Sequence, residues 1–241
     1  SKASETDNEM IIFGGDIIDS AMHASIDHIK EQFGRLDSEY LYLMGNHDFH
    51  YFYGNVMTEK YSGYDYHRAE WAYDFFQQAV KCGELKMVYR DVVNKTVYSH
   101  AGISSKWLSD NNIDFNAINT YLKDDSGIEV FRFTYGTGFS GTGDCAESSC
   151  IWIRPFSLLK NMYVDKDRHI WTQIVGHTPV RGSIIGLKAS ESTTFDVKEA
   201  DLILCDNLPN QYIVEWINDD GTLYSREIVD NVSHLGTLQE Y

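Results

Sequence analysis

The fold class follows from one short run, Met10-Ile11-Ile12-Phe13-Gly14-Gly15-Asp16-Ile17-Ile18-Asp19. Four apolar residues that stop at two glycines are typical of a buried strand ending in a turn. A second such run, residues 40–44, closes with Gly45. Between them, apolar residues at 22, 26, 29 and 33 recur with helical spacing, and Gly34 is placed to end that helix. Strand, helix and strand predict two parallel strands of an α/β sheet.

The rest of the chain continues this alternation. Helical spacing predicts a helix over 67–80, with Trp71, Phe75 and Ala79 on one stripe, and a short helix over 115–122. The further expected strands are 87–89 paired with 96–98, then 170–175, 183–187, 202–205, 212–217 and 223–229, with a hairpin turn at 219–221. The glycine-rich stretch 135–143 is expected to loop out. Because no repeat or linker divides the chain, we expect a single domain over residues 1–241.

The charge and composition limit the partners. The chain has 20 Lys plus Arg against 36 Asp plus Glu, a formal charge of −16, which excludes a generic binder of nucleic-acid backbones. No run approaches the roughly 20 apolar residues of a membrane span, and residues 1–9 are too polar for a signal peptide. Four cysteines without Cys-x-x-Cys spacing suit reduced thiols, although a Cys145/Cys150 disulfide stays an alternative. We therefore expect a cytoplasmic protein with no membrane partner.

Metal-capable side chains follow four of the predicted strands. Asp16 and Asp19 follow the first, and Asn46 and His47 follow the second; His100 and His177 follow two later strands. Since the carboxyl ends of parallel strands share one edge of a sheet, these side chains should converge. Carboxylate, amide and imidazole donors suit Mn, Fe, Zn or Mg rather than a metal that prefers thiolates. Such a site, with a histidine as general acid, is equipped for phosphoryl chemistry.

The four motifs in this order resemble the signature of the calcineurin-like metallophosphoesterases, nearest the bacterial and phage phosphoprotein phosphatases and the diadenosine tetraphosphatases. They are Gly15-Asp16-x-x-Asp19, Gly45-Asn46-His47-Asp48, Ser99-His100-Ala101-Gly102 and Gly176-His177-Thr178-Pro179. The resemblance implies a four-layer α/β/β/α sandwich of two mixed sheets. It also implies two divalent metal ions, with Mn²⁺ the first choice and Fe, Zn or Mg as alternatives. By the same resemblance Asp16 bridges the metals, Asn46, His100 and His177 are ligands, and His47 is the general acid, oriented by Asp19.

Two departures from the family pattern alter these expectations. The family's Asp-x-His motif on an earlier strand is missing, and Asp167-Arg168-His169 matches its letters but precedes a strand. We therefore expect a domain that is N-terminally incomplete, lacking its first strand and helix, with a degenerate family member as the alternative. In addition, Ser20 stands where the protein phosphatases have an arginine. Arg154 is the expected phosphate-binding substitute, with Arg181 in reserve.

Several of these residues have simpler interpretations. Asp16 and Asp19 could cap a helix, His47 could be a core histidine, and Arg154 could form an interior salt bridge. Asp48 is expected to be structural rather than a ligand, and His50 to lie at the surface. The aromatic residues of 51–66 could stack on a nucleotide base or form a packed lid. The letters G-x-G-x-x-G at 136–141 lack the strand and helix that dinucleotide binding requires.

The resemblance implies a metal-dependent hydrolase of phosphoric esters, with in-line attack of metal-bound hydroxide on a phosphomonoester, as in serine/threonine protein phosphatases. The alternatives are a diadenosine tetraphosphate hydrolase and a non-catalytic scaffold of the same fold. The expected partners are a phosphorylated protein or a small phosphorylated or nucleotide substrate.

Overall fold

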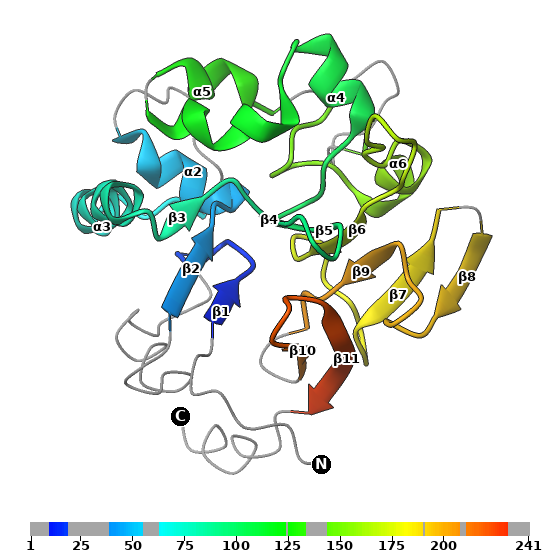
Figure 1. Ribbon diagram of the computed structural model, residues 1–241. Coiled ribbons are helices and arrows are strands. Elements are labelled where there is room, and N and C mark those ends of the chain that lie inside the picture. Colours follow the sequence, from blue (N-terminus) through cyan, green and yellow to red (C-terminus); the bar gives the residue numbers. More distant parts are fainter. Residues whose placement is uncertain are drawn as a thin grey trace.

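The computed structural model describes residues 10–18, 39–54, 63–123, 125–133, 144–189, 191–207 and 211–230. Figure 1 shows a small sheet beside a larger one, with helices packed around both. The predicted helix over 22–33 and the predicted loop over 135–143 lie outside the described residues. None of the helices in the described ranges is long and apolar enough to cross a membrane.

The small sheet contains the two strands on which the α/β prediction rests. β1 (Met10–Phe13) pairs in parallel with β2 (Glu39–Leu43), and β2 pairs in parallel with β3 (Leu85–Lys86). This confirms the predicted parallel pair. Helices α2 (Asn46–Phe52) and α3 (Ala69–Cys82) lie beside this sheet (Figure 1).

The large sheet has six strands in the order β4-β5-β6-β9-β7-β8. These strands are β4 (Val88–Asp91), β5 (Thr96–Ser99), β6 (Thr172–Val175), β7 (Ile185–Lys188), β8 (Glu191–Phe195) and β9 (Leu202–Leu204). β5, β6 and β9 run parallel, whereas the β4/β5, β7/β9 and β7/β8 pairs are antiparallel. The sheet is therefore mixed, as expected, and the arrangement is consistent with the metallophosphoesterase sandwich.

Two further groups of elements cover the large sheet. The first is α6 (Pro155–Lys160), whose Leu158 packs in a buried cluster with Val175, Leu202 and Leu204. The second is the hairpin of β10 (Gln211–Ile217) and β11 (Leu223–Asp230), whose side chains pack in another cluster with Ile203. The strand β9 is thus buried on both faces, which explains its continuous apolar sequence, Leu202-Ile203-Leu204. Arg226 of the hairpin is buried and donates to Glu215, and Tyr98 of β5 donates its hydroxyl to the same carboxylate.

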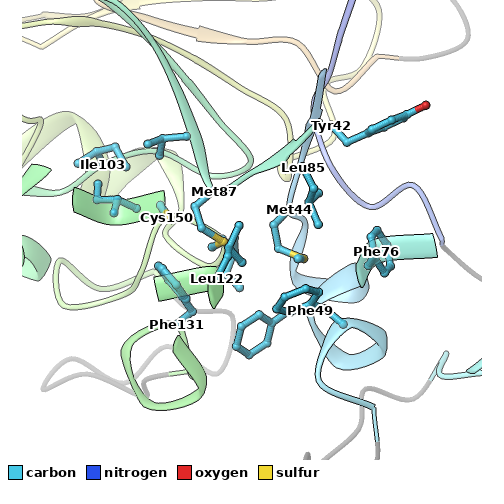
Figure 2. Close-up of a cluster of buried hydrophobic side chains, with 14 of the residues drawn as sticks. Tyr42, Met44, Phe49, Phe76, Leu85, Met87, Ile103, Leu122, Phe131 and Cys150 are labelled. Atoms are coloured by element: carbon cyan, nitrogen blue, oxygen red, sulfur yellow. The ribbon is translucent and has the colours of Figure 1, made fainter. Parts of the chain in front are cut away.

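The largest hydrophobic cluster lies between the small sheet and the central helices (Figure 2). It joins Met44 and Phe49 to side chains of three consecutive helices, α4 (Ser105–Asp110), η2 (Phe115–Lys123) and α5 (Ser126–Val130). The predicted short helix over 115–122 is confirmed as a 3-10 helix. This cluster fixes the helix that begins directly at the end of β2.

One expectation about α3 is wrong. The buried stripe is Ala72, Phe76 and Ala79, whereas Trp71 is 49% exposed and stacks on Phe75. The buried residues Ala72, Phe76 and Ala79 are spaced by four and then three positions, which follows the 3.6-residue helical turn. The predicted row from Trp71 through Phe75 to Ala79 takes two steps of four, so its members rotate away from one face of the helix.

Candidate functional site

Four chain turns meet where strands of the two sheets end. Asp16 follows β1, Asn46 is the first residue of α2 after β2, His100 follows β5, and His177 follows β6 by one glycine. β1 and β2 are parallel neighbours in one sheet, and β5 and β6 are parallel neighbours in the other. A hydrogen bond of 2.7 Å between His100 Nδ1 and the carbonyl oxygen of Gly14 joins the two sheets at this point. The predicted convergence of these four residues is therefore found.

The side-chain donors surround one nitrogen. His100 Nε2 lies 2.9 Å from Asn46 Oδ1, 3.1 Å from His177 Nδ1 and 3.4 Å from Asp16 Oδ2. Ligand atoms about 2.1 Å from a shared cation lie roughly 3.0–3.4 Å from one another in octahedral and tetrahedral arrangements. The four donor atoms are therefore spaced as a ligand set for one divalent cation.

The protonation of these groups supports the same conclusion. His100 Nδ1 must carry a proton because its partner is a carbonyl oxygen, so in neutral His100 Nε2 is an acceptor. It then faces other acceptors, the Asn46 and Asp16 oxygens, and the buried Nε2 of His177 has no hydrogen-bond partner among the described residues. In this neutral form the acceptors converge without a donor between them, an arrangement that a bound cation would satisfy. The residues present thus fit a hard or borderline divalent metal.

The electrostatics of the cluster are those of a shared positive charge. Burial opposes charge on both His100 and Asp16, yet their mutual attraction raises the pKa of His100 and holds the pKa of Asp16 well below its ordinary value. Burial, with the charges of His100 and Arg154, lowers the pKa of His177 to about 2. His177 is therefore a neutral imidazole at physiological pH, the form that binds metals.

The backbone is strained at two of the four residues. Asp16 has φ 55° and His177 has φ 56°, left-handed values that are uncommon for residues with a side chain. Gly15, with φ 92°, lies so close to the cluster that a Cβ there would be 2.6 Å from His100 Nδ1. Strain that the surrounding structure enforces gathers at functional sites. The turns are thus bent in order to bring these donors together.

Asp48 contributes hydrogen bonds rather than a ligand to this region. Its carboxylate is fully buried and accepts from the backbone N–H groups of Ile17, Ile18 and Gly45 at 3.1, 2.9 and 3.1 Å. Burial and the charge of Asp16 raise its pKa to about 6, against the effect of these three donors. The expectation that Asp48 is structural agrees with this arrangement.

Of the two residues predicted for acid catalysis, His47 and Asp19, only His47 lies among the described residues. His47 is partly exposed on α2, next to Asn46, and its backbone N–H donates to Asp16 Oδ1 at 2.9 Å. The Asp16 carboxylate therefore caps α2. Asp19 lies outside the described residues, so its partnership with His47 stays a prediction.

The two predicted phosphate-binding arginines also differ. Arg154, at the start of α6, donates from Nη1 to the carbonyl oxygen of His177 at 2.8 Å and to Thr178 Oγ1 at 3.2 Å. Burial lowers its pKa, although Asp16, Asp144 and Asp206 act in the opposite direction. Arg154 thus lies at the site and holds the His177 turn, whereas Arg181 is exposed on the segment that follows.

Several other expectations have definite outcomes. Of the aromatic residues in 51–66, Tyr51, Phe52 and Tyr53 are buried in the core and have a packing role, whereas Tyr66 is 76% exposed and is accessible to a ligand. His50 is buried at 7% exposure, so its placement at the surface was wrong; it lies on the inner face of α2, where its ring contacts Trp152. All four cysteines are free thiols.

Trp152, which forms a Trp-x-Arg element with Arg154, is a site residue to which the sequence assigned no role of its own. Its ring meets that of His177 edge to face at 6.3 Å and also packs on Phe133. The available signal was its position two residues before Arg154, which places both side chains on the turn that leads into α6.

A second group of metal-capable side chains lies at the other end of β6. Asp165, Asp167 and His169 lie close together, but Asp165 accepts from the backbone N–H groups of Asp167 and His169, and Lys95 lies 3.7 Å from its carboxylate. The letters Asp-x-His at 167–169 therefore belong to a loop that is separated from His177 by the strand β6, which alone spans roughly 10 Å at about 3.3 Å per residue.

The comparisons with known proteins agree with the geometry. Residues 2–205 match the calcineurin-like phosphoesterase family. Neither the search of curated proteins nor the search of solved structures returned a match.

Proposed function

Because the chain belongs to the calcineurin-like phosphoesterase family, which indicates metal-dependent hydrolysis of phosphoric esters, we propose that it is a phosphomonoesterase of the protein-phosphatase type. The observation that carries the proposal is the set of four donors formed by His100 Nε2 and three neighbours that lie 2.9 to 3.4 Å from it. We propose Asp16, Asn46, His100 and His177 as ligands of a divalent cation. Mn²⁺ is the first choice, and a second cation would share Asp16.

Bound divalent cations at such a site supply a hydroxide nucleophile near neutral pH and offset charge on the phosphoryl oxygens. The protein's own groups supply the remaining functions. His47, partly exposed beside the ligand Asn46, is proposed to protonate the leaving alkoxide, with Asp19 orienting it. Arg154 is proposed to orient a phosphoryl group, because its guanidinium is held beside His177. Arg181 is a second candidate for that role.

We favour a phosphomonoester over a dinucleoside polyphosphate because three aromatic side chains that could have stacked on a base are buried, whereas Tyr66 of the same stretch is 76% exposed. Tyr51, Phe52 and Tyr53 are at most 7% exposed, so these three do not offer a face on which a base could stack. The acidic surplus also suits a substrate that presents a single phosphoryl group rather than a polyanion. The proposed setting is cytoplasmic.

The test is a pair of assays with one protein preparation. A serine-phosphorylated peptide and diadenosine tetraphosphate are incubated side by side with Mn²⁺. Release of phosphate from the peptide supports the proposal, and cleavage of only the dinucleotide overturns it. Absence of both activities, together with absence of bound metal, would instead support the non-catalytic scaffold.

A further inference from the structure

Asp48 links the two turns that carry the candidate metal ligands. Its Oδ2 accepts from Ile17 N–H and Gly45 N–H, each at 3.1 Å, and its Oδ1 accepts from Ile18 N–H at 2.9 Å. Ile17 and Ile18 follow Asp16 directly, whereas Gly45 precedes Asn46. One fully buried carboxylate therefore binds the backbone of both turns, the one that follows β1 and carries Asp16 and the one that follows β2 and carries Asn46.

The two turns also touch at Asp16 itself. A Cβ on Gly45 would lie 2.9 Å from Asp16 Cα, and His47 N–H donates to Asp16 Oδ1 at 2.9 Å. Asp16 is consequently fixed on one side by the close approach of Gly45 and on the other by the Ile17 N–H that Asp48 holds. Its left-handed φ of 55° has to be maintained by such contacts.

A simple helix cap does not account for this pattern. A cap of α2 needs only the bond between Asp48 and Gly45 N–H, whereas two of the three bonds go to residues 30 and 31 positions away. A ligand role does not account for it either, because Asp48 is not among the side chains whose ligand atoms converge, Asp16, His100 and His177.

We propose that Asp48 is a positioning residue, which sets the affinity of the site for its divalent cation by locking the Asp16 turn against the turn that carries Asn46. The proposal rests on the proposed function, since it takes Asp16 and Asn46 as ligands. Groups that orient metal ligands through hydrogen bonds typically change metal affinity or activity by about 10–100-fold when they are replaced.

The test compares Asp48→Asn with a matched control, Asp165→Asn. Asp165 also accepts from three N–H groups, those of Asp167, His169 and the Trp171 indole, but it lies at the far end of β6. Each substitution turns one acceptor into a donor that faces an N–H. The readouts are the Mn²⁺ dissociation constant by titration calorimetry and kcat on p-nitrophenyl phosphate across Mn²⁺ concentrations.

The expected result is a Mn²⁺ dissociation constant raised by about 10–100-fold in Asp48→Asn, with kcat recovering at saturating Mn²⁺. Asp165→Asn should bind Mn²⁺ like the wild type. Equal dissociation constants for Asp48→Asn and Asp165→Asn would overturn the proposal. If the wild type itself bound no Mn²⁺, the proposed function would fail instead, so the two failures are distinguishable.

If Asp48→Asn does not fold, the proposal is tested by measuring amide hydrogen exchange rates in the wild-type protein. A single lock requires the amides of Ile17, Ile18 and Gly45 to open together, with one common free energy of opening. Exchange of Gly45 that is independent of Ile17 and Ile18 would refute the lock, whether or not Mn²⁺ binds.

Discussion

Replacing Gly45 with alanine tests how closely the two turns must approach. Gly45 has φ −90° and ψ 166°, which alanine adopts freely, so the substitution introduces no backbone strain of its own. The new methyl group would overlap the Asp16 amide nitrogen and Oδ1 and would lie 2.9 Å from Asp16 Cα. The Asp16 amide nitrogen, the atom closest to the new Cβ, sets the displacement: because non-bonded heavy atoms do not approach closer than about 3 Å, the Asp16 backbone has to retreat by roughly 1 Å.

Such overpacking costs about 1–3 kcal/mol of stability. The larger effect falls on the site, because a misplacement of about 1 Å near the chemistry can cost roughly 10²-fold in rate. We expect Gly45→Ala to remain folded while Mn²⁺ affinity and kcat/KM fall together. The assays are urea unfolding, Mn²⁺ titration and phosphomonoester hydrolysis.

Gly14→Ala is the matched control from the neighbouring turn. A Cβ at Gly14 meets nothing within 4 Å, and Gly14 is not among the glycines with positive φ. Its substitution should leave Mn²⁺ affinity and turnover unchanged. Wild-type affinity and turnover in Gly45→Ala would refute the reasoning, because it would mean that the position of Asp16 does not govern the site.

Three further predictions concern other parts of the molecule. His47→Ala should lower turnover by roughly 10²–10⁴-fold while Mn²⁺ content by elemental analysis stays at the wild-type value; a full rate would exclude His47 as the acid. Arg226→Ala should destabilise the fold by about 3 kcal/mol in urea unfolding, because the buried guanidinium is removed and the Glu215 carboxylate, 14% exposed, loses its cation, and unchanged stability would contradict this. The backbone N–H of His169 is the largest of the effects that lower the pKa of Asp165 to about 2. Because this pKa is lower in the folded than in the unfolded chain, ionised Asp165 contributes folding stability that is complete above the unfolded pKa of about 4 and is lost as the pH falls toward 2. Acid titration monitored by circular dichroism should therefore show a shallower loss of stability in Asp165→Asn, and identical acid profiles would refute that assignment.

The part of the fold that the sequence predicted well depends on local signals. β1 and β2 are short, largely apolar strands closed by glycine, β6 ends in Ile174-Val175 before Gly176, and their ends carry donors that converge. Their convergence follows from the parallel arrangement alone, without knowledge of any side-chain contact.

The part that could not be predicted depends on contacts between distant residues. The Asp48 carboxylate reaches backbone 30 and 31 positions away, and Arg154 reaches the carbonyl oxygen of His177 across 23 positions. The burial of His50 follows from the packing of Trp152 against α2, which no local pattern reports. The helix stripe of α3 was misjudged because two adjacent apolar rows compete there, Trp71 with Phe75 and Ala72 with Phe76.

The central claim is that Asp16, Asn46, His100 and His177 hold a divalent cation. Pulsed electron paramagnetic resonance of the wild type with bound Mn²⁺ tests it directly, because it detects nitrogen nuclei bonded to the metal. We predict modulation from two imidazole nitrogens, reduced to one in His100→Ala and in His177→Ala. Bound Mn²⁺ without nitrogen modulation, or modulation unchanged in both variants, would contradict the claim.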